Sequence, residues 1–71
     1  MTFWEVLRDL LLDNTLKATR SSWSPPQIKE RYIFVETAPS GDQVGVMFSD
    51  KTAVQYQASS DDLLANDWST I

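Results

Sequence analysis

The 71-residue sequence contains no cysteine and no histidine. Without cysteine a disulfide framework is excluded, and the chain fits a reducing compartment, most simply the cytosol. The lack of both residues excludes the usual zinc sites and Cys–His or Ser–His catalysis. The glycines are Gly41 and Gly45, so no glycine-rich phosphate-binding loop exists. We therefore expect a protein that is not an enzyme, with no catalytic residue, no metal and no cofactor.

Positive charge is also scarce, because six Lys and Arg residues stand against ten Asp and Glu residues, a net charge of −4. Nonspecific binding to a long nucleic acid needs a broad basic surface, so we do not expect it. A small anionic ligand remains compatible, since one or two placed arginines can hold it. Apolar residues occur in short runs such as Leu10 to Leu12, which predicts no transmembrane helix, no signal-peptide core and no membrane partner.

The small size of the chain is a problem for its stability. Ordering costs roughly 1.5 kcal/mol per residue, which a core of this size offsets only narrowly. Since disulfides and zinc sites are excluded, self-association is the common remaining source of stability. We expect one domain over residues 1–71 that forms a homo-oligomer.

The N-terminal residues have helical periodicity. Thr2 and Glu5 have the spacing of a capping box, and Asn14 is expected to end the helix in the left-handed conformation. A second stripe beside the main apolar face consists of Trp4, Arg8 and Leu12, so the apolar face is broad. Part of it is available either to the domain's own core or to a partner chain. The main apolar face consists of Phe3, Leu7, Leu10 and Leu11.

The remainder of the chain predicts an antiparallel sheet and a short helical turn. Gly45 either weakens its strand or marks a bulge, and the residues Ser59 to Asp62 can cap a turn at Leu63 to Ala65. The fold class is α+β, with the N-terminal helix packed on a small twisted antiparallel sheet of about four to five strands. The expected strands are Leu16–Arg20, Arg31–Glu36, Val44–Ser49 and Thr52–Gln57, followed by a short strand or tail at Asp67–Ile71.

The loop from Ser21 to Pro26 carries the best candidate for ligand binding. Its paired prolines favour a stiff, irregular segment that presents Trp23. Arg20 could hold a phosphate and Trp23 could stack on a purine, while the two serines supply hydroxyls. The alternative is structural: Trp23 covers the sheet edge and Arg20 pairs with a carboxylate. Trp4 and Trp68 are expected to be core or interface anchors.

Three segments carry a resemblance to a known family: Met1–Leu7, Lys17–Trp23 and Ala58–Trp68. Together they resemble the small phage proteins of the second Thoeris anti-defence family. Ser22 stands where that family has glycine, and Tyr56 stands where it often has tryptophan. The family's closing motif is matched by Ser59, Asp62, Leu63, Leu64, Ala65, Asp67 and Trp68.

The resemblance implies a sponge that sequesters a small nucleotide second messenger of the host immune system, a cyclic ADP-ribose isomer or a cyclic dinucleotide, without degrading it. It implies a homo-oligomer, commonly a dimer of dimers, in the cytoplasm of the infected bacterial host. The expected ligand-binding residues are Arg20, Ser22 and Trp23. For Ser59 and Asp62 the favoured role is capping of the last helical turn, with a ribose contact as the alternative. A protein-protein interaction module remains a rival function, with the acidic surface and the leftover helix face as its docking site.

Overall fold

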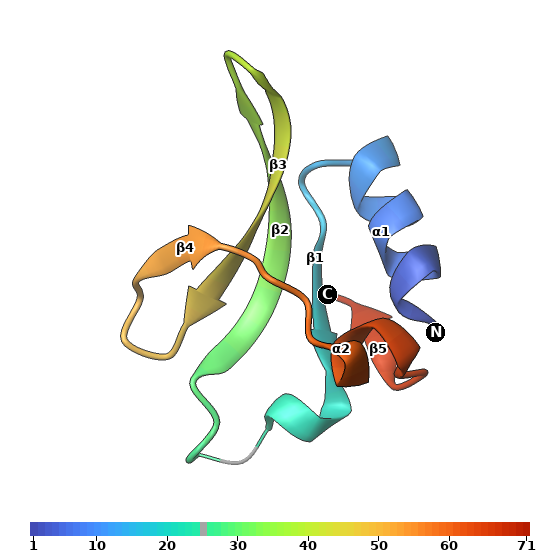
Figure 1. The fold of residues 1–71 in the computed structure, drawn as a ribbon, viewed down its shortest axis with the longest axis vertical. Helices are drawn as coiled ribbons and strands as arrows, with labels where there is room; N and C mark the ends of the chain where they lie inside the picture. The colour runs from blue at the N-terminus through green and yellow to red at the C-terminus, as the bar shows by residue number, and fades with distance from the viewer. Residues whose placement is uncertain (25) are drawn as a thin grey trace.

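The computed structural model describes residues 1–24 and 26–71, and within these ranges the chain forms one antiparallel sheet of five strands (Figure 1). The strand order is β4-β3-β2-β1-β5, so the last strand lies beside the first. The expected α+β fold class is confirmed. The helical elements are α1 (Phe3–Leu12), the 3-10 turn η1 (Ser21–Trp23) and α2 (Ser60–Leu64). The strands are β1 (Lys17–Arg20), β2 (Glu30–Ala38), β3 (Gly41–Phe48), β4 (Ala53–Gln55) and β5 (Trp68–Thr70).

Helix α1 begins with the expected capping box. The Glu5 N–H donates to Thr2 Oγ1 at 3.3 Å, and the Thr2 N–H donates to Glu5 Oε1 at 2.9 Å. The buried face is centred on Phe3, Val6 and Leu10, whereas Leu11 is 53% exposed. The expectation that Leu11 is on the buried face was therefore wrong. Val6 and Leu11 flank the line through Phe3 and Leu10 on opposite sides, and the side of Val6 faces the core. None of the helices in the described ranges is long and apolar enough to cross a membrane.

The end of α1 differs from the expectation. Asp13 adopts an extended conformation and donates its N–H to the Asp9 carbonyl at 3.0 Å, while its carboxylate accepts the Thr15 N–H and O–H. This Asp-centred turn satisfies the local polar groups, so no left-handed residue is needed at Asn14. Among the described non-glycine residues, only Lys51 has a positive φ.

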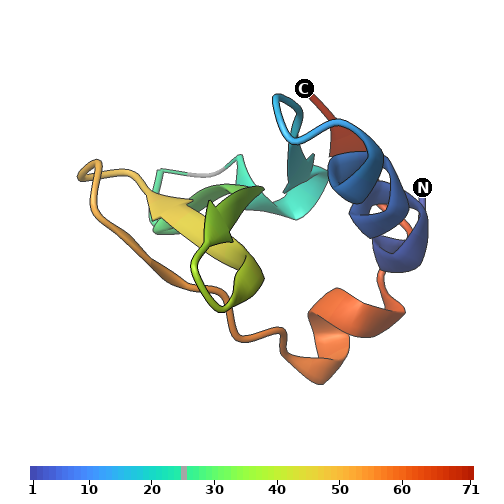
Figure 2. The ribbon, with the colours of Figure 1, turned by 90° about the horizontal axis from the view of Figure 1, so that it is seen from above.

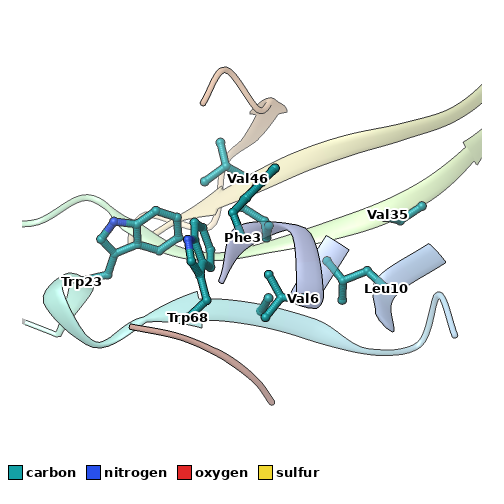
Figure 3. Close-up of a cluster of buried hydrophobic side chains, with 9 residues drawn as sticks. Phe3, Val6, Leu10, Trp23, Val35, Val46 and Trp68 are labelled. Atoms are coloured by element: carbon teal, nitrogen blue, oxygen red, sulfur yellow. The ribbon is translucent and has the colours of Figure 1, made fainter. Parts of the chain in front are cut away.

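The hydrophobic core lies between α1 and the sheet. Trp68 is 2% exposed and makes edge-to-face contacts with Phe3 at 5.5 Å and with Trp23 at 5.1 Å between ring centroids. Figure 3 shows this aromatic group continuing along α1 through Val6 and Leu10. Figure 2 shows α1 and α2 together on one side of the molecule, away from the β3–β4 connection. The core role expected for Trp68 is confirmed, but Trp4 is 62% exposed and lies outside the core.

The β2–β3 hairpin is the longest pairing in the sheet. Its register pairs Ala38 with Gly41, and Gly41 takes a φ of 122° that favours glycine. Gly45 lies opposite Phe34, whose ring would be 2.6 Å from a Cβ at position 45. Glycine at position 45 thus leaves room for the Phe34 ring, and Gly45 does not mark a bulge. The register shift lies instead in β2 between Glu30 and Tyr32.

The sheet also has an outer face, turned away from α1. Side chains alternate along a strand, so the burial of Ile33 and Val35 places Tyr32 and Phe34 on the opposite face. Lys17 Nζ lies over the Tyr32 ring, 4.6 Å from its centroid. The loop after η1 includes Pro25, so the paired prolines of the expected stiff segment lie partly outside the described residues. The residues Ser21–Trp23 form one 3-10 turn at the start of this loop.

Candidate functional site

Arg20, at the end of β1, is the centre of a half-buried charge network. Its Nε donates to Asp67 Oδ1 at 2.8 Å, and its Nη1 donates to Asp62 Oδ1 at 2.9 Å. The Tyr56 hydroxyl donates to Asp62 Oδ2 at 2.7 Å. One guanidinium therefore joins β1 to α2 and to the start of β5, and Asp62 brings the segment after β4 into the same network.

Asp67 connects this network to η1. Its Oδ2 accepts from Ser21 Oγ at 3.0 Å and from the Ser22 N–H at 3.3 Å. The Arg20 hydrogen bond, followed by the Ser21 hydrogen bond, lowers the pKa of Asp67 to about 2. The same Asp67 hydrogen bond is the main reason that the pKa of Arg20 is raised. Asp67 therefore stays ionised at neutral pH and fixes the start of η1.

Tyr56 serves as the proton donor of the network. Burial is the main cause that raises its pKa, and the hydrogen bond to Asp62 raises it further. The phenol therefore keeps its proton throughout the physiological range. Within the described ranges, no buried side-chain polar atom lacks a hydrogen-bond partner, so the network is closed on its inner side.

The structure places three expected site residues in this network. Arg20 and Asp62 form an ion pair, and Ser22 contributes its backbone N–H to Asp67. The alternative interpretation, in which Arg20 pairs with a carboxylate, is confirmed. The Asp62 carboxylate does not cap a helix end: it accepts from Arg20 and Tyr56.

The other two expected residues have different positions. Ser59 is the N-cap of α2, since its Oγ accepts the Asp62 N–H at 3.2 Å, and the capping role is confirmed. Trp23 borders the network, but its ring packs against Trp68 and only 7% of its surface is exposed. Stacking of a base on this ring therefore requires η1 to move away from Trp68.

Sequence reasoning missed three residues that shape this region: Tyr56, Asp67 and Arg31. Asp67 was visible as part of the closing motif, and Tyr56 as a replacement for tryptophan, but neither had an assigned contact. Arg31 stands at the register shift of β2, and Nη1 of its guanidinium donates to the backbone carbonyls of Trp23 and Glu30. No spacing signal distinguished Arg31 from the other basic residues.

An open hollow of about 580 Å³ lies beside the network, between β1 and the η1 loop. Small-molecule sites usually occupy about 300–1,000 Å³, so the volume suits a nucleotide-sized ligand. Its wall combines two guanidinium groups with several hydroxyls, donors that match phosphate and ribose oxygens. The lining residues are Thr19, Arg20, Ser21, Trp23, Ser24, Pro26, Arg31 and Ser69.

A different hollow of about 460 Å³ lies on the Tyr56 side of the network. The carboxylates of Glu30 and Asp62 border it, so an anionic ligand would meet like charge there. Within the described ranges, no three Asp or Glu residues are grouped as a metal site requires. The hollow beside η1 is therefore the better match to a small anion.

Together these features define a small α+β domain that is closed by an arginine–carboxylate network and carries a donor-rich hollow at one end of its sheet. A family model described as "Thoeris anti-defense 2-like domain" matches residues 1–71. The chain belongs to this family, so the resemblance of the three segments is confirmed and a phage anti-defence role is supported. No curated protein matches the chain.

Proposed function

We propose that the protein is a phage anti-defence sponge, which binds a cyclic ADP-ribose isomer in the cytoplasm of the infected bacterial host and holds it without degrading it. Membership of the Thoeris anti-defense 2-like family over the whole chain is the observation that carries this proposal. The donor-rich hollow beside Arg20 supports it, because its size and its guanidinium and hydroxyl groups suit a nucleotide. A cyclic dinucleotide is the alternative ligand.

The hydrogen bonds of Asp62 and Asp67 agree with a protein that binds its ligand without reacting with it. Asp62 and Asp67 are both engaged as acceptors of charged or hydroxyl donors. A carboxylate with a pKa of about 2, such as Asp67, is a weak general base at neutral pH. Sequestration needs tight binding and abundant protein rather than turnover, so the proposed sponge is not an enzyme and uses no cofactor.

Self-association is part of the proposal. Leu12 is 80% exposed, Leu11 53% and Trp4 62%; we call these three apolar residues of α1 the α1 stripe, which the exposed Arg8 interrupts. A homo-oligomer would cover this stripe, and a dimer of dimers would allow ligand contacts from more than one subunit. A chain this small also has little room for a deep pocket of its own.

The test is to mix the protein with cyclic ADP-ribose isomers and cyclic dinucleotides, remove unbound nucleotide, and then denature the protein. Release of intact ligand is the expected result. Release of hydrolysed product would make the protein an enzyme, and absence of binding to every nucleotide in the panel would overturn the proposal.

A variant that fills the hollow locates the binding site. Replacing Trp23 by alanine is unsuitable, because removal of a buried tryptophan costs about 3–5 kcal/mol and could unfold the chain. Ser69 is exposed on β5 and lines the hollow, so Ser69→Trp should block the ligand while the fold is kept. Thr37→Trp, an exposed position at the far end of β2, is the matched control.

A protein-protein interaction module is the second candidate, and the α1 stripe is the observation that favours it. This candidate predicts a stable complex with another protein and no rise in melting temperature with any cyclic nucleotide. The sponge predicts a melting temperature that rises with ligand concentration, because the ligand binds the native state alone.

A further inference from the structure

The charge of Arg20 is already matched within the protein. Its guanidinium is in direct contact with two carboxylates, at 2.8 and 2.9 Å. One positive charge is therefore set against two negative charges at short range. A phosphate placed at Arg20 would approach Asp62 and Asp67 as well, and their repulsion would offset much of its attraction to the guanidinium. A phosphate site in this region needs a cation that has no carboxylate partner.

Arg31 is such a cation. It lies at the register shift of β2, half-buried, and its Nη1 donates to backbone carbonyls of Trp23, Ile28 and Glu30. These neutral acceptors fix the position of the guanidinium without cancelling its charge. Over residues 1–24 and 26–71, Arg31 takes part in no ion pair, and no hydrogen bond uses its Nε or Nη2. The guanidinium of Arg31 is thus held in place and retains N–H donors for an anion.

Arg31 also lies between two hollows. On one side is the hydroxyl-rich hollow described above, which it shares with Thr19 and Ser69. On the other side is an open hollow of about 510 Å³ bordered by Tyr32, Met47 and Lys51. The first wall offers hydroxyls, and the second offers an aromatic ring, a thioether and a second cation. In a cyclic ADP-ribose isomer or a cyclic dinucleotide, a ribose lies on each side of the phosphate. A phosphate at Arg31 can therefore place one ribose in the first hollow, and the other ribose with its base in the second.

We propose that Arg31, rather than Arg20, is the anion-binding residue of a nucleotide site that spans both hollows. The phosphate lies on the free edge of the Arg31 guanidinium, and the base packs against Tyr32 and Met47. The role of Arg20 is then positional: it holds η1 through Asp67 and so shapes the hydroxyl-rich wall. This inference rests on the proposed function, since it names the residue that the nucleotide ligand contacts.

The experiment compares Arg31→Gln with Lys29→Gln by calorimetric titration of cyclic ADP-ribose isomers and of 3′,3′-cyclic GMP–AMP. Lys29 is an exposed cation two residues away, so its replacement makes the same change in net charge. We expect Arg31→Gln to weaken binding by about tenfold or more, the size of one lost charged hydrogen bond, and Lys29→Gln to have little effect. Binding should also become less dependent on salt in Arg31→Gln, because a charge contact has been removed.

Arg31→Lys separates the anion contact from the support of the loop. It keeps the positive charge but lacks the planar fork, so a loss of affinity at an unchanged melting temperature supports the proposal. Wild-type affinity in a folded Arg31→Gln or Arg31→Lys variant would overturn it, as would equal losses in Arg31→Gln and Lys29→Gln. A wild-type protein that binds no nucleotide overturns the proposed function itself, a result distinct from binding that ignores Arg31.

Discussion

At the scale of single residues, Arg20 shows how one side chain can organise several segments. It is largely buried between Asp62 and Asp67, which lie 42 and 47 residues away in the sequence. Removing one partner of such a group leaves a charge without compensation, and this costs more than the intact pair contributes. Variants of Arg20 should therefore affect folding before they reveal any ligand contact.

Asp67 gives a prediction for acid stability. Its pKa is about 2 in the folded chain and has an ordinary value of 3.8. Because the folded pKa is lowered, the stabilisation is fully present above the unfolded pKa and is lost as the pH falls toward 2. Asp67→Asn should remove up to about 2 kcal/mol at neutral pH and flatten the stability profile between about pH 4 and pH 2. Urea denaturation between pH 2 and pH 7 measures both effects.

Asp42→Asn is the control for that measurement, since Asp42 is exposed on β3 and far from the network. It should leave the stability at neutral pH unchanged. An Asp67→Asn variant with the wild-type pH profile would show that Asp67 does not stabilise the fold through its charge.

Gly45 gives a second prediction at this scale. A side chain at position 45 would meet the Phe34 ring, which lies 2.6 Å from the position of a Cβ. Gly45→Val should destabilise the chain by about 1–3 kcal/mol, the usual cost of overpacking. The same substitution in a Phe34→Ala background should cost less, because the ring is gone. Equal costs in both backgrounds, measured by thermal unfolding, would contradict the packing explanation.

At the scale of elements, α2 depends on its first residue. The helix has five residues, and its N-cap Ser59 accepts the Asp62 N–H. Ser59→Ala should cost about 0.5–2 kcal/mol of folding stability without weakening nucleotide binding. Ser60→Ala, at the next position, which is also exposed, should have a smaller effect. Loss of ligand affinity in Ser59→Ala at full stability would favour the ribose contact instead of the cap.

The elements themselves were largely predictable from local patterns. The capping box, the N-cap and the turn residues depend on neighbours within a few positions. The structure confirms the capping box at Thr2, the N-cap at Ser59 and the turn of the β2–β3 hairpin. The side of α1 that is buried depends on the direction from which the sheet approaches. Leu11 was therefore assigned to the buried face, where it fits a helical period, and Val6 was not included in that face.

The contacts of the site were less predictable than the elements. Arg20 was singled out by its place before Trp23, but its carboxylate partners lie far along the sequence. The pairing of β1 with β5 (Figure 1) brings Asp67 beside Ser21, and Asp62 comes from α2. Arg31 could not be distinguished from the other basic residues, because its position depends on a register shift in β2 that the residue pattern does not predict.

At the scale of the whole molecule, the donor-rich hollow and the exposed apolar residues of α1 lie on different surfaces, and further exposed apolar residues are Val54, Leu64 and Ile71. The donor-rich hollow lies where η1, β1 and β5 meet. The α1 stripe lies on the part of α1 that is not buried against the core. A chain of 71 residues has little surface to spare for an uncovered apolar stripe. The proposed self-association would cover it and add to the stability that the small core provides.

The corresponding prediction is that Leu11→Lys combined with Leu12→Lys reduces the oligomer to a smaller species. Both residues are exposed in the last turn of α1, where positive charge interacts favourably with the helix dipole, so the fold of each chain should be kept. Light scattering measures the mass of the wild type and the variant, and circular dichroism checks the fold. Val54→Lys, a half-exposed position on β4, is the control and should leave the mass unchanged. An unchanged mass in the double variant would exclude the α1 stripe as the subunit interface, and a monomeric wild type would overturn the proposed oligomer.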